Sequence, residues 1–180
     1  MAVTTKNNFV VITGGPGAGK TTLLEALSRL GYNFVGETAR TIIRERLSRG
    51  LSPRPDPAKF ARQIYEVDLY NYMNHIETEQ WVFFDRSFLD SAAMLFEAST
   101  TEPVEIAEAL KNYRFRRSVF IAPPWEEIYT NDNERDQTFG DGVAVYEKLH
   151  RWYEQNDYEL IEIPKDSVDD RVRFILERIQ

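Results

Sequence analysis

A glycine-rich stretch near the amino terminus carries the clearest chemistry in the sequence. Residues 14–22 read GGPGAGKTT and fit the pattern G-x-x-x-x-G-K-[ST] in full. Glycines let the backbone turn tightly, so that successive N–H groups can point into one concavity and bind phosphate oxygens. In such a loop the lysine, here Lys20, reaches the β- and γ-phosphates, and the hydroxyl of Thr21 ligates Mg²⁺. The stretch therefore predicts binding of a nucleoside triphosphate, taken as ATP, together with Mg²⁺. The expected nucleotide contacts are Gly15, Pro16, Gly17, Ala18, Gly19, Lys20, Thr21 and Thr22.

The loop is preceded by a predicted strand and followed by a predicted helix, which is the context of a phosphate-binding loop. Residues 9–13, FVVIT, are apolar and β-branched, and they predict a buried parallel strand. Residues 23–30 have helical spacing and end before Gly31. A helix that starts at the loop adds the positive end of its dipole to the phosphate site. The alternative is a glycine-rich turn without a ligand, which the flanking strand and helix disfavour.

Further candidate residues follow three other predicted strands. In an open parallel sheet, ligands bind beyond the carboxyl ends of the strands, so residues at these ends are expected to converge on one cleft. The strands are predicted at 32–35, 81–84 and 118–121. The residues that follow them are Glu37 and Arg40, then Asp85 and Arg86, then Arg135 within the polar excursion 131–137.

Two carboxylates at these strand ends have candidate chemical roles. Asp85 ends an apolar strand, which is the Walker B pattern, and it is expected to orient Mg²⁺ or the water ligands of Mg²⁺. The structural alternative for Asp85 is a turn residue or helix cap. Glu37 is expected to be the general base that takes the proton of an acceptor hydroxyl. The alternative for Glu37 is a carboxylate that only stabilises the dipole of its own helix.

Three arginines have both a catalytic and a structural interpretation. Arg86 either contacts phosphate or is a partner for Glu37, and the structural alternative is a surface ion pair. Arg40 lies one turn after Glu37 on the same helix face, so it either holds a substrate anion or pairs with Glu37. Arg135 either belongs to a solvated loop or to a lid that closes and neutralises charge on the transferring phosphoryl group.

The rest of the chain alternates short apolar strands with helices. Helices are predicted at 38–47, 58–79, 90–98, 103–112, 125–129, 141–155 and 168–179, and a fifth strand at 158–163. This alternation predicts an α/β fold with a parallel sheet covered on both faces. A length of 180 residues is expected to form a single domain, 1–180.

The amino-acid composition limits the kinds of partner and the cellular compartment that are expected for this protein. The net charge of −7 argues against a nucleic-acid partner, because such binding relies on Lys and Arg that neutralise phosphates. The absence of cysteine excludes disulfides and thiolate metal sites and fits a cytoplasmic location. No apolar run approaches the ~20 residues of a membrane span, and the polar first eight residues do not resemble a signal peptide. We expect a cytoplasmic monomer or homodimer with no membrane partner.

Four segments together resemble a known family. Residues 14–22, the GETAR of 36–40, the FFDRS of 83–87 and the NERD of 133–136 resemble the small AAA-domain predicted ATPases of bacteria. These are kinase-like P-loop proteins, related to nicotinamide riboside kinase domains and more distantly to deoxynucleoside kinases. The resemblance implies a three-layer P-loop NTPase fold, with a five-stranded parallel sheet of kinase-type order and helices on both faces. In that order the strand of Asp85 lies beside the strand of the phosphate loop.

The resemblance also carries site residues. In deoxynucleoside kinases a glutamate after the second strand is the base, and Glu37 matches it. Their third strand is followed by Glu-Arg-Ser, whereas this chain has Asp-Arg-Ser at 85–87. Their lid carries several arginines, whereas the excursion here offers only Arg135.

Three functions remain open at this point. The first is a kinase that transfers the γ-phosphate to a hydroxyl of a small, nucleoside-like or other metabolite. The second is an ATPase or nucleotide-dependent switch with no acceptor, and the third, disfavoured by the acidic charge, is a polynucleotide 5′-end kinase. A GTPase is disfavoured because the sequence has no N-K-x-D motif. Glu37 and the lid-like excursion favour the kinase, since a switch needs no base on the acceptor side. No short motif identifies the acceptor.

Overall fold

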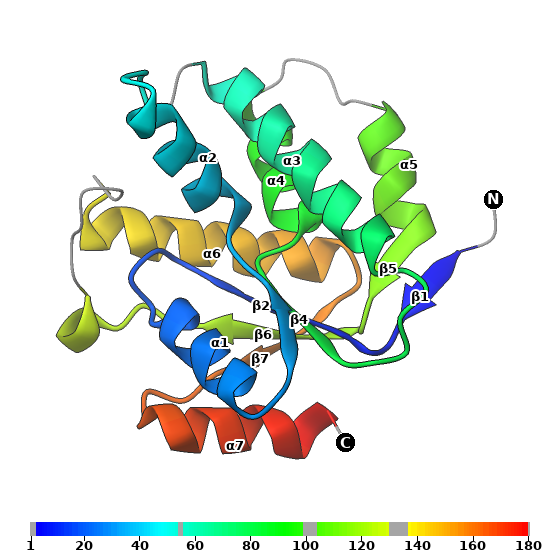
Figure 1. The fold of residues 1–180 in the computed structure, drawn as a ribbon, viewed down its shortest axis with the longest axis vertical. Coiled ribbons are helices and arrows are strands. Elements are labelled where there is room, and N and C mark those ends of the chain that lie inside the picture. The colour runs from blue at the N-terminus through cyan, green and yellow to red at the C-terminus, as the bar shows by residue number, and fades with distance from the viewer. Residues whose placement is uncertain (1–2, 54–55, 99–103, 130–136, 180) are drawn as a thin grey trace.

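A central sheet of five parallel strands organises the computed structural model, which describes residues 3–53, 56–98, 104–129 and 137–179 (Figure 1). In sheet order the strands are β3 (Asn33–Val35), β4 (Val82–Asp85), β2 (Phe9–Gly14), β6 (Ser118–Ala122) and β7 (Glu159–Glu162). The register places Ile12 of β2 opposite Asp85 of β4. The predicted sheet and the predicted neighbourhood of the Asp85 strand and the phosphate-loop strand are therefore confirmed.

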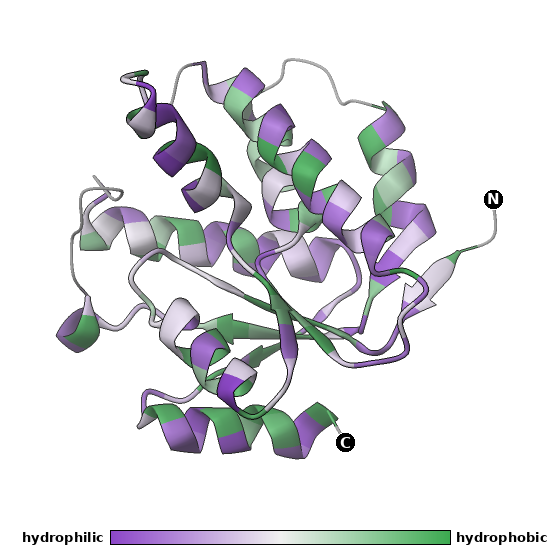
Figure 2. Cartoon of the chain, viewed as in Figure 1, coloured by the Kyte–Doolittle hydropathy of each residue, from purple (hydrophilic) through white to green (hydrophobic). Residues whose placement is uncertain are grey.

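Helices cover both faces of this sheet. They are α1 (Lys20–Arg29), α2 (Thr38–Ser48), α3 (Pro57–Asn74), α4 (Phe88–Ala98), α5 (Val104–Asn112), the 3₁₀ turn η1 (Glu126–Ile128), α6 (Phe139–Gln155) and α7 (Val168–Ile179). Figure 1 shows α1 and α7 on one side of the sheet and the other α-helices on the opposite side. In Figure 2 the central strands are largely hydrophobic, whereas the helices mix the two colours, as expected for amphipathic helices on a buried sheet.

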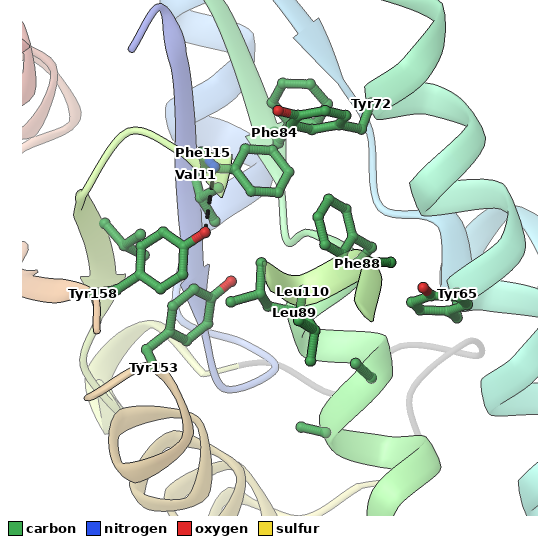
Figure 3. Close-up of a cluster of buried hydrophobic side chains, with 14 of the residues drawn as sticks. Val11, Tyr65, Tyr72, Phe84, Phe88, Leu89, Leu110, Phe115, Tyr153 and Tyr158 are labelled. Atoms are coloured by element: carbon green, nitrogen blue, oxygen red, sulfur yellow. Dashed lines mark hydrogen bonds between the residues drawn. The ribbon is translucent and has the colours of Figure 1, made fainter. Parts of the chain in front are cut away.

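Strand β2 separates two hydrophobic cores, because successive side chains of a strand point to opposite faces. Val10 and Ile12 pack with α1 and α7, whereas Phe9 and Val11 pack with α3, α4, α5 and α6. Rings dominate the second core (Figure 3), where the ring centroids of Tyr72 and Phe88 lie 5.4 Å apart. Such a rigid core gives the strand ends a fixed platform.

The structure differs most from the predicted elements in two places. Helix α3 ends at Asn74 rather than near 79, because side chains from the amino-terminal segment hold the chain that follows it. Lys6 Nζ and Asn8 Nδ2 each donate to the carbonyl of Thr78 at 3.0 Å. A separate pair of short parallel strands, β1 (Thr4–Lys6) and β5 (Tyr113–Phe115), was not predicted at all.

No helix of the described segments has the length and apolar character needed to cross a membrane.

Candidate active site

The phosphate loop joins β2 to α1 as its sequence pattern predicts. Gly17 and Gly19 have φ values of 77° and 73°, a region that glycine adopts without strain. Gly17 also has no room for a side chain, since a Cβ there would lie 2.3 Å from the ring of Tyr129. Gly19 is the N-cap of α1, so the first amides of that helix directly continue the loop. This arrangement can present backbone donors to phosphate.

Lys20 folds back onto the loop that precedes it. The side chain is buried, and Nζ donates to the carbonyl of Gly15 at 2.8 Å and to that of Gly14 at 3.2 Å. The ammonium group is thus held inside the curve of the loop, where a phosphate oxygen would replace a carbonyl as its acceptor.

Arg171 of α7 supports the loop from the other side, and sequence reasoning missed it. Its Nη2 donates to the carbonyl of Ala18 at 3.1 Å, and its guanidinium lies 5.6 Å from the ring centroid of Trp125. Burial lowers the pKa of Arg171. Arg171 is a positioning residue, because it fixes the loop backbone through Ala18.

Asp85 is buried at the end of β4, and one of its carboxylate oxygens, Oδ1, accepts no hydrogen bond from the described residues. Burial raises the pKa of Asp85 to about 6, while the positive charge of Lys20 opposes this rise. A buried carboxylate oxygen that accepts no hydrogen bond, close to the phosphate loop, is suited to binding a cation.

The donor set fits Mg²⁺ better than an all-protein metal site. The described segments contain no group of three or more His, Cys, Asp or Glu side chains that could hold a metal ion. Mg²⁺ characteristically takes one or two protein oxygen ligands and completes its shell with waters and substrate phosphates. The hydroxyl of Thr21, in the first turn of α1, and the carboxylate of Asp85 are the residues of this chain that would hold it.

Glu37 lies at the N-cap position of α2 but does not cap the helix through its side chain. Its Oε1 lies 3.3 Å from Nε of Arg86, and its Oε2 lies 3.7 Å from Nε of Arg40. The side chains of Glu37 and Arg86 are 19% and 18% exposed, so this is a largely buried ion pair rather than the surface pair considered above. Both predicted pairings with Glu37 are present.

Arg86 is held by a second carboxylate, Asp90, which sequence reasoning did not single out. Nη1 of Arg86 lies 3.4 Å from Oδ1 of Asp90, and Arg86 adopts the uncommon φ of 69°. Oδ2 of Asp90 accepts hydrogen bonds from the amide of Ser87 at 3.0 Å and from the hydroxyl of Tyr153 at 2.6 Å. Burial works to lower the pKa of Arg86, but the charges of Glu37 and Asp90 outweigh it and raise the pKa.

A cavity of about 290 Å³ opens beside the phosphate loop. Pro16 of the loop, Glu37 and Arg86 belong to its wall. The apolar part of its wall comes from α2, α3, α4 and α6, namely Ile43, Phe60, Ile64, Met94, Val145 and Leu149. The cavity thus combines apolar side chains with several charged ones, which is the usual character of a small-molecule site.

The structure therefore brings most of the predicted site residues together. Glu37, Arg40 and Arg86 line the cavity. Lys20 and Asp85 interact electrostatically at the adjoining loop. Arg135 lies outside the described residues. Besides Asp90 and Arg171, sequence reasoning also missed Asp68, a carboxylate of α3 that lines the same cavity.

Comparisons with known proteins agree with this architecture. A family model described as "AAA domain" matches residues 9–171. No curated protein matches the chain significantly. Among solved structures, deoxyadenosine kinase from M. mycoides with the products dCMP and a flexible dCDP has a TM-score of 0.70 and 15% identity, covering 95% of this chain and 98% of that one. The same kinase with dATP bound has a TM-score of 0.67 at 15% identity and the same coverage. At this identity the likeness shows a shared fold.

Proposed function

The chain belongs to the AAA domain family, and from this premise we propose that it is an ATP- and Mg²⁺-dependent kinase for a small hydroxyl-bearing molecule. The observation that carries the proposal is the cavity, because it adjoins the phosphate loop at Pro16 and has Glu37 in its wall. A kinase needs an acceptor site that adjoins the γ-phosphate and carries a proton acceptor. The similar fold of a deoxyadenosine kinase supports the same assignment.

The size of the cavity limits the acceptor. A volume of about 290 Å³ lies at the small end of the range of ligand pockets, which is roughly 300–1,000 Å³. The acceptor is therefore of nucleoside size or smaller.

The residues of the chain then have distinct tasks. The loop amides and Lys20 bind the phosphates of ATP. Thr21 and Asp85 would hold Mg²⁺, which would supply positive charge to the reaction. Glu37 takes the proton of the acceptor hydroxyl while the oxygen of that hydroxyl attacks the γ-phosphorus. The bond from the γ-phosphorus to the bridging oxygen breaks, and ADP leaves with that oxygen. The guanidinium groups of Arg86 and Arg40 hold the carboxylate of Glu37 in place.

The alternative is an ATPase or nucleotide-dependent switch, and one observation favours it. Glu37 is already paired with Arg86 and Arg40, so the carboxylate could serve the structure alone. A switch, however, needs no largely apolar cavity beside the loop.

Substitution of Glu37 by glutamine distinguishes the two functions. Acceptors are first found by screening nucleosides and metabolites for thermal stabilisation in the presence of a non-hydrolysable ATP analogue. Glu37→Gln should then slow transfer by about 10²–10⁴-fold, the usual contribution of a general base, and slow background ATP hydrolysis less. Glu45→Gln, at an exposed position of the same helix, is the matched control and should leave both rates unchanged. Transfer that survives in Glu37→Gln within about tenfold would mean that Glu37 is not the base.

A further inference from the structure

The carboxylates that line the cavity differ in their partners. Three of the four have a cation beside them in the described residues. Glu37 pairs with Arg86 and Arg40, and Asp90 pairs with Arg86. Glu97 pairs with Lys148. The fourth is Asp68, for which no ion pair is present within those residues.

Asp68 instead receives uncharged hydrogen bonds from two neighbouring helices. Ser91 Oγ of α4 donates to Oδ2 of Asp68 at 2.9 Å, and the hydroxyl of Thr38 in α2 also bonds to the carboxylate. The side chain lies in the cavity wall and belongs to a half-buried residue, so a ligand in the cavity can reach it. Two hydroxyl donors orient the carboxylate but leave its charge without a counter-charge.

The fixed charges around Asp68 do not supply the missing compensation. Burial raises the pKa of Asp68 to about 7, and the negative charge of Asp90 raises it more than the positive charge of Arg86 lowers it. Arg86 is itself paired with both Glu37 and Asp90. A carboxylate in this position destabilises the site when it is ionised, unless a cation arrives with the ligand.

We propose that Asp68 selects the acceptor by binding a protonated nitrogen, so that the acceptor is a small amino alcohol or a similar cationic hydroxyl compound. This inference rests on the proposed kinase function for the hydroxyl, but the cation site itself needs only the cavity. The apolar wall formed by Phe60, Ile64 and Met94 lowers the local dielectric and strengthens a charge pair inside the cavity. Ser91 is a positioning residue that orients the Asp68 carboxylate.

Two probes of equal size separate a charge requirement from simple filling of the cavity. The cationic probe is 4-(aminomethyl)benzyl alcohol, and the neutral probe is 1,4-benzenedimethanol, which has a hydroxyl in place of the ammonium group. Each is titrated, up to its solubility limit, into the ¹⁵N-labelled protein with Mg²⁺ and a non-hydrolysable ATP analogue. The titration is run at about pH 8, where a carboxylate with a pKa near 7 is ionised.

The cationic probe should bind at least about tenfold more tightly than the neutral probe, the scale of one charge-assisted hydrogen bond. It should also shift the amide signals of Thr38 and Ser91. Asp68→Asn should abolish this preference, and Asp68→Ser serves the same purpose if the asparagine variant does not fold. Glu66→Gln, at an exposed position of the same helix, should keep the preference.

Several results would overturn the inference. These are equal affinity for the two probes, absence of binding by the cationic probe, a preference that survives removal of Asp68, or a preference that leaves the signals of Thr38 and Ser91 unmoved. The titration involves no phosphoryl transfer, so its failure is distinct from failure of the kinase proposal. A protein that transfers phosphate to neutral acceptors alone would keep the proposed function and refute the cation site.

Discussion

Asp90→Asn tests the buried network that holds Arg86 in place. Asp90 is 4% exposed, and both of its oxygens accept hydrogen bonds. The amide nitrogen of asparagine cannot accept. If it replaces Oδ2, the donors of Ser87 and Tyr153 lose their acceptor, and if it replaces Oδ1, Thr13 and Arg86 lose theirs. In either orientation of the asparagine amide, at least two donors therefore lose the acceptor that Asp90 provides.

The size of the effect follows from these donors. A buried donor without an acceptor costs about 1–3 kcal/mol. The hydroxyls of Ser87 and Tyr153 also contact each other at 2.7 Å, so one of them can find another acceptor. We therefore expect Asp90→Asn to lower the free energy of unfolding by about 2–4 kcal/mol. In a chain of 180 residues this corresponds to a fall in Tm of roughly 5–15 °C.

Thermal unfolding followed by circular dichroism measures this change. Tyr153→Phe is the matched control, because it removes a single hydroxyl from the same network and should cost about 1 kcal/mol. Asp90→Asn should also reduce ATP turnover at a temperature at which it is folded, since Arg86 loses one of its two carboxylates. A Tm that falls no further than that of Tyr153→Phe would refute the role of Asp90 as the centre of the network.

Three further predictions concern residues of the site. Lys20→Ala should abolish ATP turnover and weaken nucleotide binding with an unchanged circular dichroism spectrum, and unchanged turnover would refute the phosphate-loop assignment. Asp85→Asn should shift the Mg²⁺ dependence of turnover to higher Mg²⁺ concentrations, whereas Glu37→Gln should not. A similar shift in both variants would contradict the separate roles of Asp85 in binding Mg²⁺ and of Glu37 as the base. Asp68→Asn should stabilise the protein above about pH 7 and have little effect near pH 4, as urea unfolding at several pH values can measure. Burial raises the pKa of Asp68 from 3.8 to about 7, so its ionised form destabilises the folded state progressively between these values. At about 1.4 kcal/mol per pKa unit, the gain is at most about 4 kcal/mol, and a gain that does not vary with pH would contradict the burial of this carboxylate.

The sequence was sufficient to predict the elements whose signals are local. Residues 14–22 have the spacing of a phosphate loop. The apolar run before Asp85 indicates that Asp85 stands at the end of a strand. The rule that ligands bind at the carboxyl ends of parallel strands then placed Glu37 and Arg86 in one site, where the structure finds them 3.3 Å apart. The kinase-type strand order came from the family resemblance.

Features that depend on distant contacts could not be predicted in this way. The end of α3 at Asn74 is decided by Lys6 and Asn8, which lie about seventy positions away in the sequence. Asp68 reads as an ordinary polar residue of an amphipathic helix until Ser91 and the cavity are placed beside it. A short strand pair such as β1 and β5 has too few residues for a periodic signal, since each strand is three residues long.

The most direct test of the kinase assignment is the fate of the γ-phosphoryl group. ³¹P nuclear magnetic resonance of the protein with Mg²⁺, ATP and an acceptor found by the stabilisation screen separates a phosphomonoester from inorganic phosphate. The account predicts that a phosphomonoester forms in step with ADP, and that Glu37→Gln slows its formation by about 10²–10⁴-fold while inorganic phosphate is released at a rate closer to that of the parent protein. Formation of ADP and inorganic phosphate alone, at a rate that no acceptor changes, would contradict the kinase and favour the ATPase or switch.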